Sequence, residues 1–189
     1  MKIEIGVSAR HVHLSKEDFE ILFGKNEKLN KLRDLRRPGE FAAQETVTVK
    51  TAKNKFDNVR IIGPIRDYTQ VEISKTDSYF LGIEPPIRNS GDIIGSSPIT
   101  ILTDKGEVTK EFGCIIPARH IHISTAELNK NGWSQSSTVK VKLLGEKAGT
   151  IENVYVRIVE DNNSELHIDL DDANAHNVKS KEEAEVIFN

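Results

Sequence analysis

Four of the six histidines in this sequence fall in two short His-x-His pairs, His11 with His13 and His120 with His122. In a β-strand, residues i and i+2 point to the same face and lie roughly 7 Å apart, so each pair directs two imidazoles into one space. Imidazole nitrogen is a preferred zinc ligand, and a catalytic zinc site commonly has three protein ligands and one open position. We therefore predict that each pair binds a metal together with a third ligand.

Two residues are candidates for that third ligand. Glu72 lies inside the strand-like residues 69–74, and His167 lies inside residues 165–169. In each segment the apolar neighbours would face one way and the Glu or His the other way. A lone Glu or His on a strand is more often a solvent-facing residue, so this alternative stays open.

Four arginines form a second group of residues that could take part in binding or catalysis. Arg66 and Arg88 follow Gly-Pro-Ile and Pro-Pro-Ile, whereas Arg10 and Arg119 directly precede the first histidine of each pair. A proline-restricted backbone can hold a guanidinium in a fixed place, where it grips phosphate oxygens bidentately. Beside metals, the four arginines indicate an anionic substrate. Taken singly, each could equally form a surface ion pair with a carboxylate.

The remaining reactive side chains are interpreted as structural. His176 lies in the polar segment 172–177 and is predicted to be a surface residue. Cys114 follows Gly113 and precedes two isoleucines, which favours a buried, inert thiol over a nucleophile. A single cysteine also cannot form an internal disulfide, which is in keeping with a reducing compartment.

The elements that must position these residues are mainly short strands. Segments with alternating apolar and polar residues stop at Gly, Asn or Pro, whereas two segments begin with serine and acidic residues as helices do. We predict a mainly β fold with a few short helices, built as compact barrels or sandwiches. The clearest strands are residues 46–50 and 138–143, and the clearest helices are residues 15–23 and 124–129.

An internal repeat divides the chain. Residues 9–15 (ARHVHLS) recur as residues 118–124 (ARHIHIS), and residues 57–62 are echoed at residues 152–157. Two related halves explain these echoes better than one irregular domain. We expect the halves to be residues 1–108 and 109–189, with a strand crossing between them allowed.

Composition limits the classes of function. The chain has 189 residues, 37% hydrophobic and 29% charged, with a formal net charge of −3. This is typical of a globular protein and gives no basic field for nucleic acid. The sequence has neither a signal-peptide pattern nor an apolar run that could span a membrane, so we expect an intracellular protein without nucleic-acid or membrane partners.

In order and spacing, these motifs resemble the PduL-type phosphate propanoyltransferases over almost the whole chain. The segments that carry the resemblance are GVSARHVHLS at 6–15, GPIR at 63–66, TQVEIS at 69–74, PPIR at 85–88, RHIH at 119–122 and HID at 167–169. The family transfers short acyl groups such as propionyl or acetyl between coenzyme A and phosphate. The resemblance therefore implies an acyltransferase whose substrates are acyl-CoA or CoA and phosphate or acyl phosphate.

The resemblance also implies a fold and a site. It implies two pseudo-symmetric β-barrel domains and two zinc ions in a cleft between them, with Arg66 as the catalytic, phosphate-contacting residue. Arg10, Arg88 and Arg119 are further candidates for substrate binding. The native metal, the acyl chain, the direction of the reaction and self-association into a homo-oligomer are left open. The matching ligands are His11, His13 and Glu72 for one metal and His120, His122 and His167 for the other.

Family members packed into bacterial microcompartments usually carry a targeting extension before the first motif, and here that motif begins almost at once. We therefore expect a cytoplasmic protein in preference to one in a microcompartment lumen. Two other functions stay open. A His-rich zinc site can activate water and hydrolyse thioesters or phosphoesters, and histidines can hold a purely structural zinc in a non-catalytic scaffold.

Overall fold

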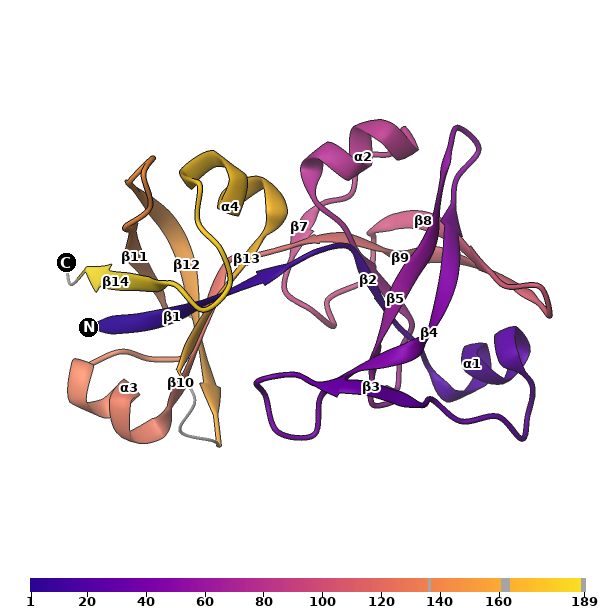
Figure 1. Ribbon diagram of the computed structural model, residues 1–189, viewed down its shortest axis with the longest axis horizontal. Coiled ribbons are helices and arrows are strands. Elements are labelled where there is room, and N and C mark those ends of the chain that lie inside the picture. The colour runs from indigo at the N-terminus through magenta and orange to yellow at the C-terminus, as the bar shows by residue number, and fades with distance from the viewer. Residues whose placement is uncertain (136, 161–163, 188–189) are drawn as a thin grey trace. The chain divides into compact units, whose positions relative to one another are not determined.

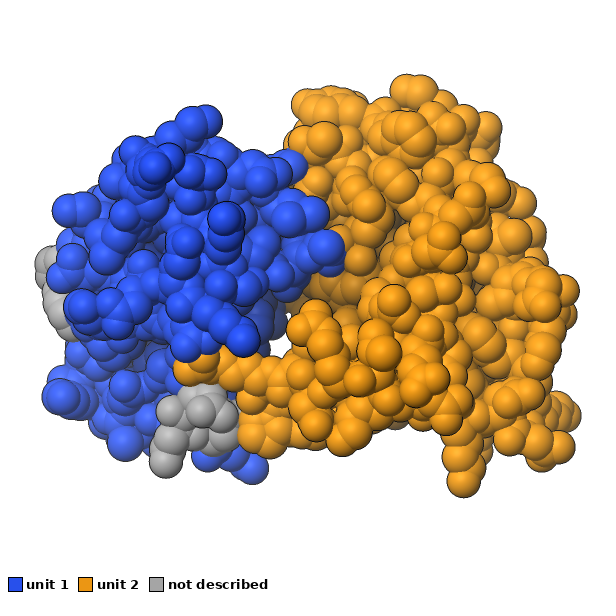
Figure 2. Space-filling model, in the orientation of Figure 1, with its two compact units in different colours: residues 1–9, 118–189 blue, residues 10–117 orange. Residues whose placement is uncertain are grey.

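The computed structural model describes residues 1–135, 137–160 and 164–187. It divides into two compact units, which Figure 2 colours blue and orange. Unit 1 consists of residues 1–9 and 118–189, and unit 2 consists of residues 10–117. The compact units therefore do not coincide with the expected halves 1–108 and 109–189.

Unit 1 is a closed barrel of six strands in the order β1-β13-β10-β12-β11-β14 (Figure 1). Two helices of seven residues each follow strands β10 and β13. In chain order the elements are β1 (Lys2–Ser8), β10 (His120–Ser124), α3 (Thr125–Asn131), β11 (Thr138–Leu143), β12 (Gly149–Val159), β13 (Glu165–Asp169), α4 (Leu170–His176) and β14 (Glu183–Ile187).

Unit 2 closes a second ring of six strands, β4-β5-β2-β6-β9-β8, because β8 pairs with both β4 and β9. Strands β3 and β7 extend it beside β4 and β9. The prediction of a mainly β fold with two barrels and short helices is confirmed. The elements are β2 (His11–His13), α1 (Lys16–Phe23), β3 (Lys31–Asp34), β4 (Phe41–Lys50), β5 (Lys55–Gly63), β6 (Gln70–Glu72), α2 (Lys75–Leu81), β7 (Ile87–Arg88), β8 (Ser97–Leu102) and β9 (Glu107–Pro117).

Strand membership explains why the units differ from the expected halves. Strand β1 lies in unit 1, where it pairs in parallel with β13 and antiparallel with β14, although the next residues of the chain begin unit 2. Strand β9 lies in unit 2, where its last residues pair in parallel with β6. Each strand that leads into a His-x-His motif therefore belongs to the unit that does not contain that motif.

Each unit has its own hydrophobic core. The core is formed mainly by inward-facing side chains, which alternate with outward-facing ones along each strand. In β1, Ile3 and Ile5 are buried in the core of unit 1, and in β2 Val12 is buried in the core of unit 2. Because side chains alternate along a strand, burial of Val12 turns His11 and His13 to the other face. The same holds for Ile121 between His120 and His122.

The helices begin where their caps predict. Ser15 and Ser124 accept hydrogen bonds from the backbone N–H groups of Asp18 and Glu127, which confirms both expected helix starts. Helices α2 and α4 start at Ser74 and Asp169 in the same way. Among the described residues, no helix has the length and apolar character required to cross a bilayer.

Candidate metal sites

In both units, a His-x-His strand pairs antiparallel with a strand that carries the third candidate ligand. His11 lies opposite Glu72 and His13 opposite Gln70 between β2 and β6. Residues directly opposite each other in an antiparallel pair point to the same face, so these four side chains form a two-by-two array. Between β10 and β13, His120 lies opposite His167, and His122 opposite Glu165, in the same arrangement.

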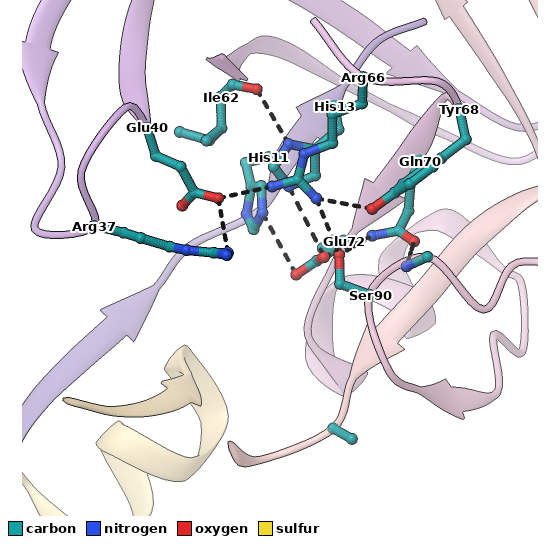
Figure 3. A network of polar contacts seen from close by, with 12 residues as sticks. His11, His13, Arg37, Glu40, Ile62, Arg66, Tyr68, Gln70, Glu72 and Ser90 are labelled. Atoms are coloured by element: carbon teal, nitrogen blue, oxygen red, sulfur yellow. Dashed lines mark hydrogen bonds and ion pairs between the residues drawn. The ribbon is translucent and has the colours of Figure 1, made fainter. Parts of the chain in front are cut away.

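In unit 2 the array brings together the first predicted ligand set, as Figure 3 shows. Nε2 of His11 lies 3.4 Å and Nε2 of His13 lies 4.0 Å from the two oxygens of the Glu72 carboxylate. The potential ligand atoms of these three residues all lie within 4.8 Å of one another. His13 and Glu72 are buried, so the donors converge in an environment with little water.

The backbone fixes the orientation of His13. Its Nδ1 lies 3.1 Å from the carbonyl oxygen of Ile62, so a proton on Nδ1 is donated to that carbonyl and Nε2 keeps its lone pair. Burial, followed by the neighbouring His11 and the Arg66 cation, lowers the pKa of His13 well below its ordinary value. His13 is therefore neutral near pH 7, which is the state that binds a metal.

In unit 1 the second predicted set also converges. The rings of His120 and His167 stack with centroids 4.8 Å apart, and the centroid of His122 lies 4.5 Å from that of His167. Nδ1 of His120 lies 2.9 Å from the carbonyl oxygen of Ala118, which again leaves Nε2 as the donor to a metal. Burial, followed by His167, lowers the pKa of His120 well below its ordinary value.

His167 adds an independent sign that a cation fits this site. Its Nε2 is buried and forms no hydrogen bond with any described residue. Buried polar atoms are almost always hydrogen-bonded, so an imidazole nitrogen that makes no hydrogen bond, 3.0 Å from the Glu165 carboxylate and next to two other histidines, fits a metal ligand. Three histidines, or two histidines and a glutamate, are both donor sets that hold catalytic zinc with one position open. Both groups therefore fit zinc.

Arg66 lies beside the unit 2 group and is held by several contacts (Figure 3). Its backbone N–H donates to the carbonyl of Leu14, next to β2. The guanidinium donates from Nη1 to the Tyr68 hydroxyl at 2.9 Å and to Ser90 Oγ at 3.4 Å, and from Nη2 to Glu40 Oε1 at 3.1 Å. The predicted catalytic arginine therefore has a fixed position, and its positive charge lowers the pKa of His13.

Arg10 and Arg119, which the sequence placed among substrate-binding candidates, are engaged in matching ion pairs. Arg10 donates from Nε and Nη2 to both oxygens of Asp77 at 3.0 and 2.5 Å. Arg119 donates from the same two atoms to both oxygens of Asp172 at 2.7 and 2.6 Å. Asp77 lies in the first turn of α2, which follows Glu72, and Asp172 lies in the first turn of α4, which follows His167. These contacts favour a structural role, in which each arginine ties a helix to a His-x-His strand.

Neither Arg88 nor His176 is a member of the two ligand groups. Arg88, in β7, is exposed and has its Nε 3.7 Å from Asp92 Oδ2. His176 is the last residue of α4, where its Nδ1 lies 3.1 Å from the carbonyl oxygen of Lys147. Within unit 2 the structure thus brings together His11, His13 and Glu72 with Arg66 beside them. Within unit 1 it brings together His120, His122 and His167, and His176 belongs to neither group.

Cys114 is fully buried in the core of unit 2, as predicted. Burial, with a smaller contribution from Asp77, raises the pKa of its thiol to about 12. We expect the folded protein to react with a thiol reagent at pH 8 at least about 100-fold more slowly than free cysteine, because thiolate is the reactive form. Absorbance of the released chromophore measures this rate. Protein unfolded in urea is the control, and rapid stoichiometric labelling of folded protein would contradict the assignment.

Several polar residues of these sites were not identified as site residues from the sequence alone. Gln70 is fully buried and donates to Glu72 Oε1 at 2.6 Å and to Ser90 Oγ at 2.9 Å. Glu40 accepts from both Arg37 and Arg66 on one oxygen. The motif TQVEIS did carry Gln70, and the alternation of that strand would have placed it on the same face as Glu72.

The chain is similar in sequence to known phosphate propanoyltransferases. A model of the phosphate propanoyltransferase family matches residues 4–179. Among curated relatives, a phosphate propanoyltransferase of Thermotoga maritima is 45% identical over 92% of this chain and 83% of its own length. Those of Priestia megaterium and Listeria monocytogenes are 46% and 42% identical over 92% and 98% of this chain, and over 80% and 87% of their own lengths. The chain belongs to the phosphate propanoyltransferase family.

Proposed function

We propose that this protein is a zinc-dependent phosphate acyltransferase that interconverts a short-chain acyl-CoA and phosphate with an acyl phosphate and CoA. The observation that carries the proposal is the pair of convergent ligand groups, one in each barrel, in a chain of this family. Each group has three donors of the types that hold a catalytic zinc with an open position. Membership of the family supports acyl-CoA and phosphate as substrates.

Arg66 is the residue that we assign to phosphate. Its guanidinium already donates to three oxygen acceptors, from Tyr68, Ser90 and Glu40, so its planar fork is preorganised. A preorganised guanidinium binds a tetrahedral oxyanion bidentately and loses little side-chain entropy on binding. Glu40 also receives a hydrogen bond from Arg37, so two cations share one carboxylate oxygen and the cluster keeps a net positive charge for an anion.

The reaction requires a phosphate oxygen to attack the thioester carbonyl. The new carbon–oxygen bond forms, the carbon–sulfur bond breaks, and CoA leaves as its thiolate. Bound zinc would supply Lewis acidity toward the carbonyl oxygen or the departing sulfur. The residues of this chain orient the reactants: Arg66 holds the phosphate in a fixed direction, and the buried histidines keep their neutral form for the metal. With Cys114 buried and protonated, direct attack without an acyl-enzyme is the route we favour.

The proposal is tested by following both products. Purified, zinc-replete protein is incubated with acetyl-CoA or propionyl-CoA and phosphate, and CoA release and acyl phosphate are measured in the same samples. We expect equal amounts of the two products and no CoA release without phosphate. CoA release with free acid in place of acyl phosphate would show a hydrolase. Absence of turnover with full zinc content would instead indicate a structural metal scaffold.

A further inference from the structure

The two-by-two arrays of the two units differ in the position of their negative charge. In unit 2, the residue opposite the first histidine is the carboxylate Glu72, and the residue opposite the second is the neutral Gln70. In unit 1, the residue opposite the first histidine is His167, and the residue opposite the second is the carboxylate Glu165. Each array therefore contains one carboxylate, but at exchanged positions.

The two exchanged residues contact each other in both arrays. Gln70 Nε2 donates to Glu72 Oε1 at 2.6 Å. Glu165 Oε2 lies 3.0 Å from His167 Nε2, yet this nitrogen forms no hydrogen bond with any described residue. A close contact without a hydrogen bond fits a nitrogen whose lone pair is directed to a cation, with the carboxylate beside it.

Glu165 is also held in place by its surroundings. Its side chain is only 12% exposed, and it lies over Gly6 of the neighbouring strand β1. A Cβ atom at position 6 would come within 2.8 Å of Glu165 Oε1, so the glycine leaves the space that the carboxylate occupies. A largely buried carboxylate needs a cationic or hydrogen-bonding partner to offset the loss of its hydration.

We propose that Glu165 is the charge-balancing carboxylate of the three-histidine site, where it supplies from beside the ligands the negative charge that the ligand Glu72 supplies in the other site. This inference rests on the proposed function, because it assumes that the site of His120, His122 and His167 binds zinc. Glu165 stands beside the three converging donors, in contact with His167, so it acts as a positioning residue. It holds the His167 ring and places a negative charge next to a dication.

The test isolates the unit 1 site within the 189-residue chain. A parent variant with His11→Ala and His13→Ala loses two ligands of the other site and should bind about one zinc per chain. In this parent, Glu165→Gln keeps the shape of the side chain and removes its charge. We expect zinc affinity, measured by competition with a chromophoric chelator, to fall by about 10- to 100-fold. Glu165→Asp should lose less, and the exposed Glu183→Gln is the matched control that should change nothing.

A double substitution tests whether the loss of zinc affinity comes from the missing negative charge or from a general change in structure. Glu165→Gln combined with His167→Glu recreates in unit 1 the Gln-and-Glu arrangement of unit 2. We expect this variant to bind zinc more tightly than Glu165→Gln alone, although it lacks one more histidine. In addition, Gly6→Ala should weaken zinc binding while leaving the charge intact, because it displaces the carboxylate.

The outcomes distinguish failure of the inference from failure of the proposed site. Unchanged zinc affinity in folded Glu165→Gln would overturn the role of Glu165 and leave the metal site in place. A double substitution that binds no better than Glu165→Gln would overturn the exchange of charge between the two positions. A parent that binds no zinc at all would overturn both the metal site and this inference. Circular dichroism of each metal-free variant verifies that it is folded.

Discussion

Replacement of His167 by alanine is expected to reduce the zinc content from about two ions per chain to about one, since a site with two of three protein ligands binds zinc weakly. Transferase activity should be nearly lost. The reason is that His167 stacks on His120 and lies next to His122, so its removal breaks the convergent donor set. Elemental analysis of the purified, folded variant measures the zinc, and the two-product assay measures the activity.

His176→Ala is the matched control for this experiment. His176 lies at the end of α4, where its Nδ1 contacts the carbonyl oxygen of Lys147. Because His176 is not part of either ligand group, we expect unchanged zinc content and near-normal turnover. Full zinc occupancy in His167→Ala, or loss of zinc in His176→Ala, would show that His167 is not the third ligand.

Replacement of Arg66 by lysine is expected to raise the KM for phosphate by about 10-fold or more while the KM for acyl-CoA changes less, because lysine keeps the charge but lacks the planar fork. Lysine has one nitrogen in place of the two Nη atoms that now contact Tyr68, Ser90 and Glu40. It therefore cannot keep the preorganised geometry that we assign to phosphate binding. Initial rates at varied phosphate and fixed acyl-CoA measure the change.

Arg33→Lys is the control, since Arg33 is an exposed residue of β3. The same kinetic parameters as in the unchanged protein are expected for this variant. If Arg66→Lys had the phosphate dependence of the unchanged protein, Arg66 would be removed from the phosphate site and a different cation would have to supply that contact.

Much of the fold was predictable from local sequence. Alternation in residues 46–50 and 138–143 correctly marked the second half of β4 and the whole of β11, and the serines before residues 16 and 125 marked two helix starts. The repeat of ARHxHxS indicated two related units. The strand membership of residues 2–8 was not predictable, because the pairing of β1 with β13 joins residues that are far apart in sequence.

The candidate sites were predictable only in part. The His-x-His pairs were evident because their spacing alone turns two imidazoles to one face. Glu72 and His167 were candidates because of their strand-like alternation, but only the family resemblance assigned each to a particular His-x-His pair, since a short polar alternation does not say which strand lies beside it. Gln70 and Glu165 were missed for the same reason: their places opposite His13 and His122 follow from strand register.

The partners of Arg10 and Arg119 show a signal that the sequence did contain. Asp77 follows Glu72 by five residues, and Asp172 follows His167 by five residues. This repeated spacing places an acid in the first turn of a helix that begins just after each third ligand. Together with an arginine before each His-x-His motif, it predicts two equivalent ion pairs.

The central claim is that acyl transfer to phosphate depends on zinc bound by both ligand groups. The most direct measurement follows phosphate-dependent CoA release together with zinc content in protein that has been stripped by a chelator and then given zinc again. We expect activity to disappear with the metal and to return when about two zinc ions per chain are bound, one for each three-ligand group. Full activity in protein that contains no metal would contradict the account.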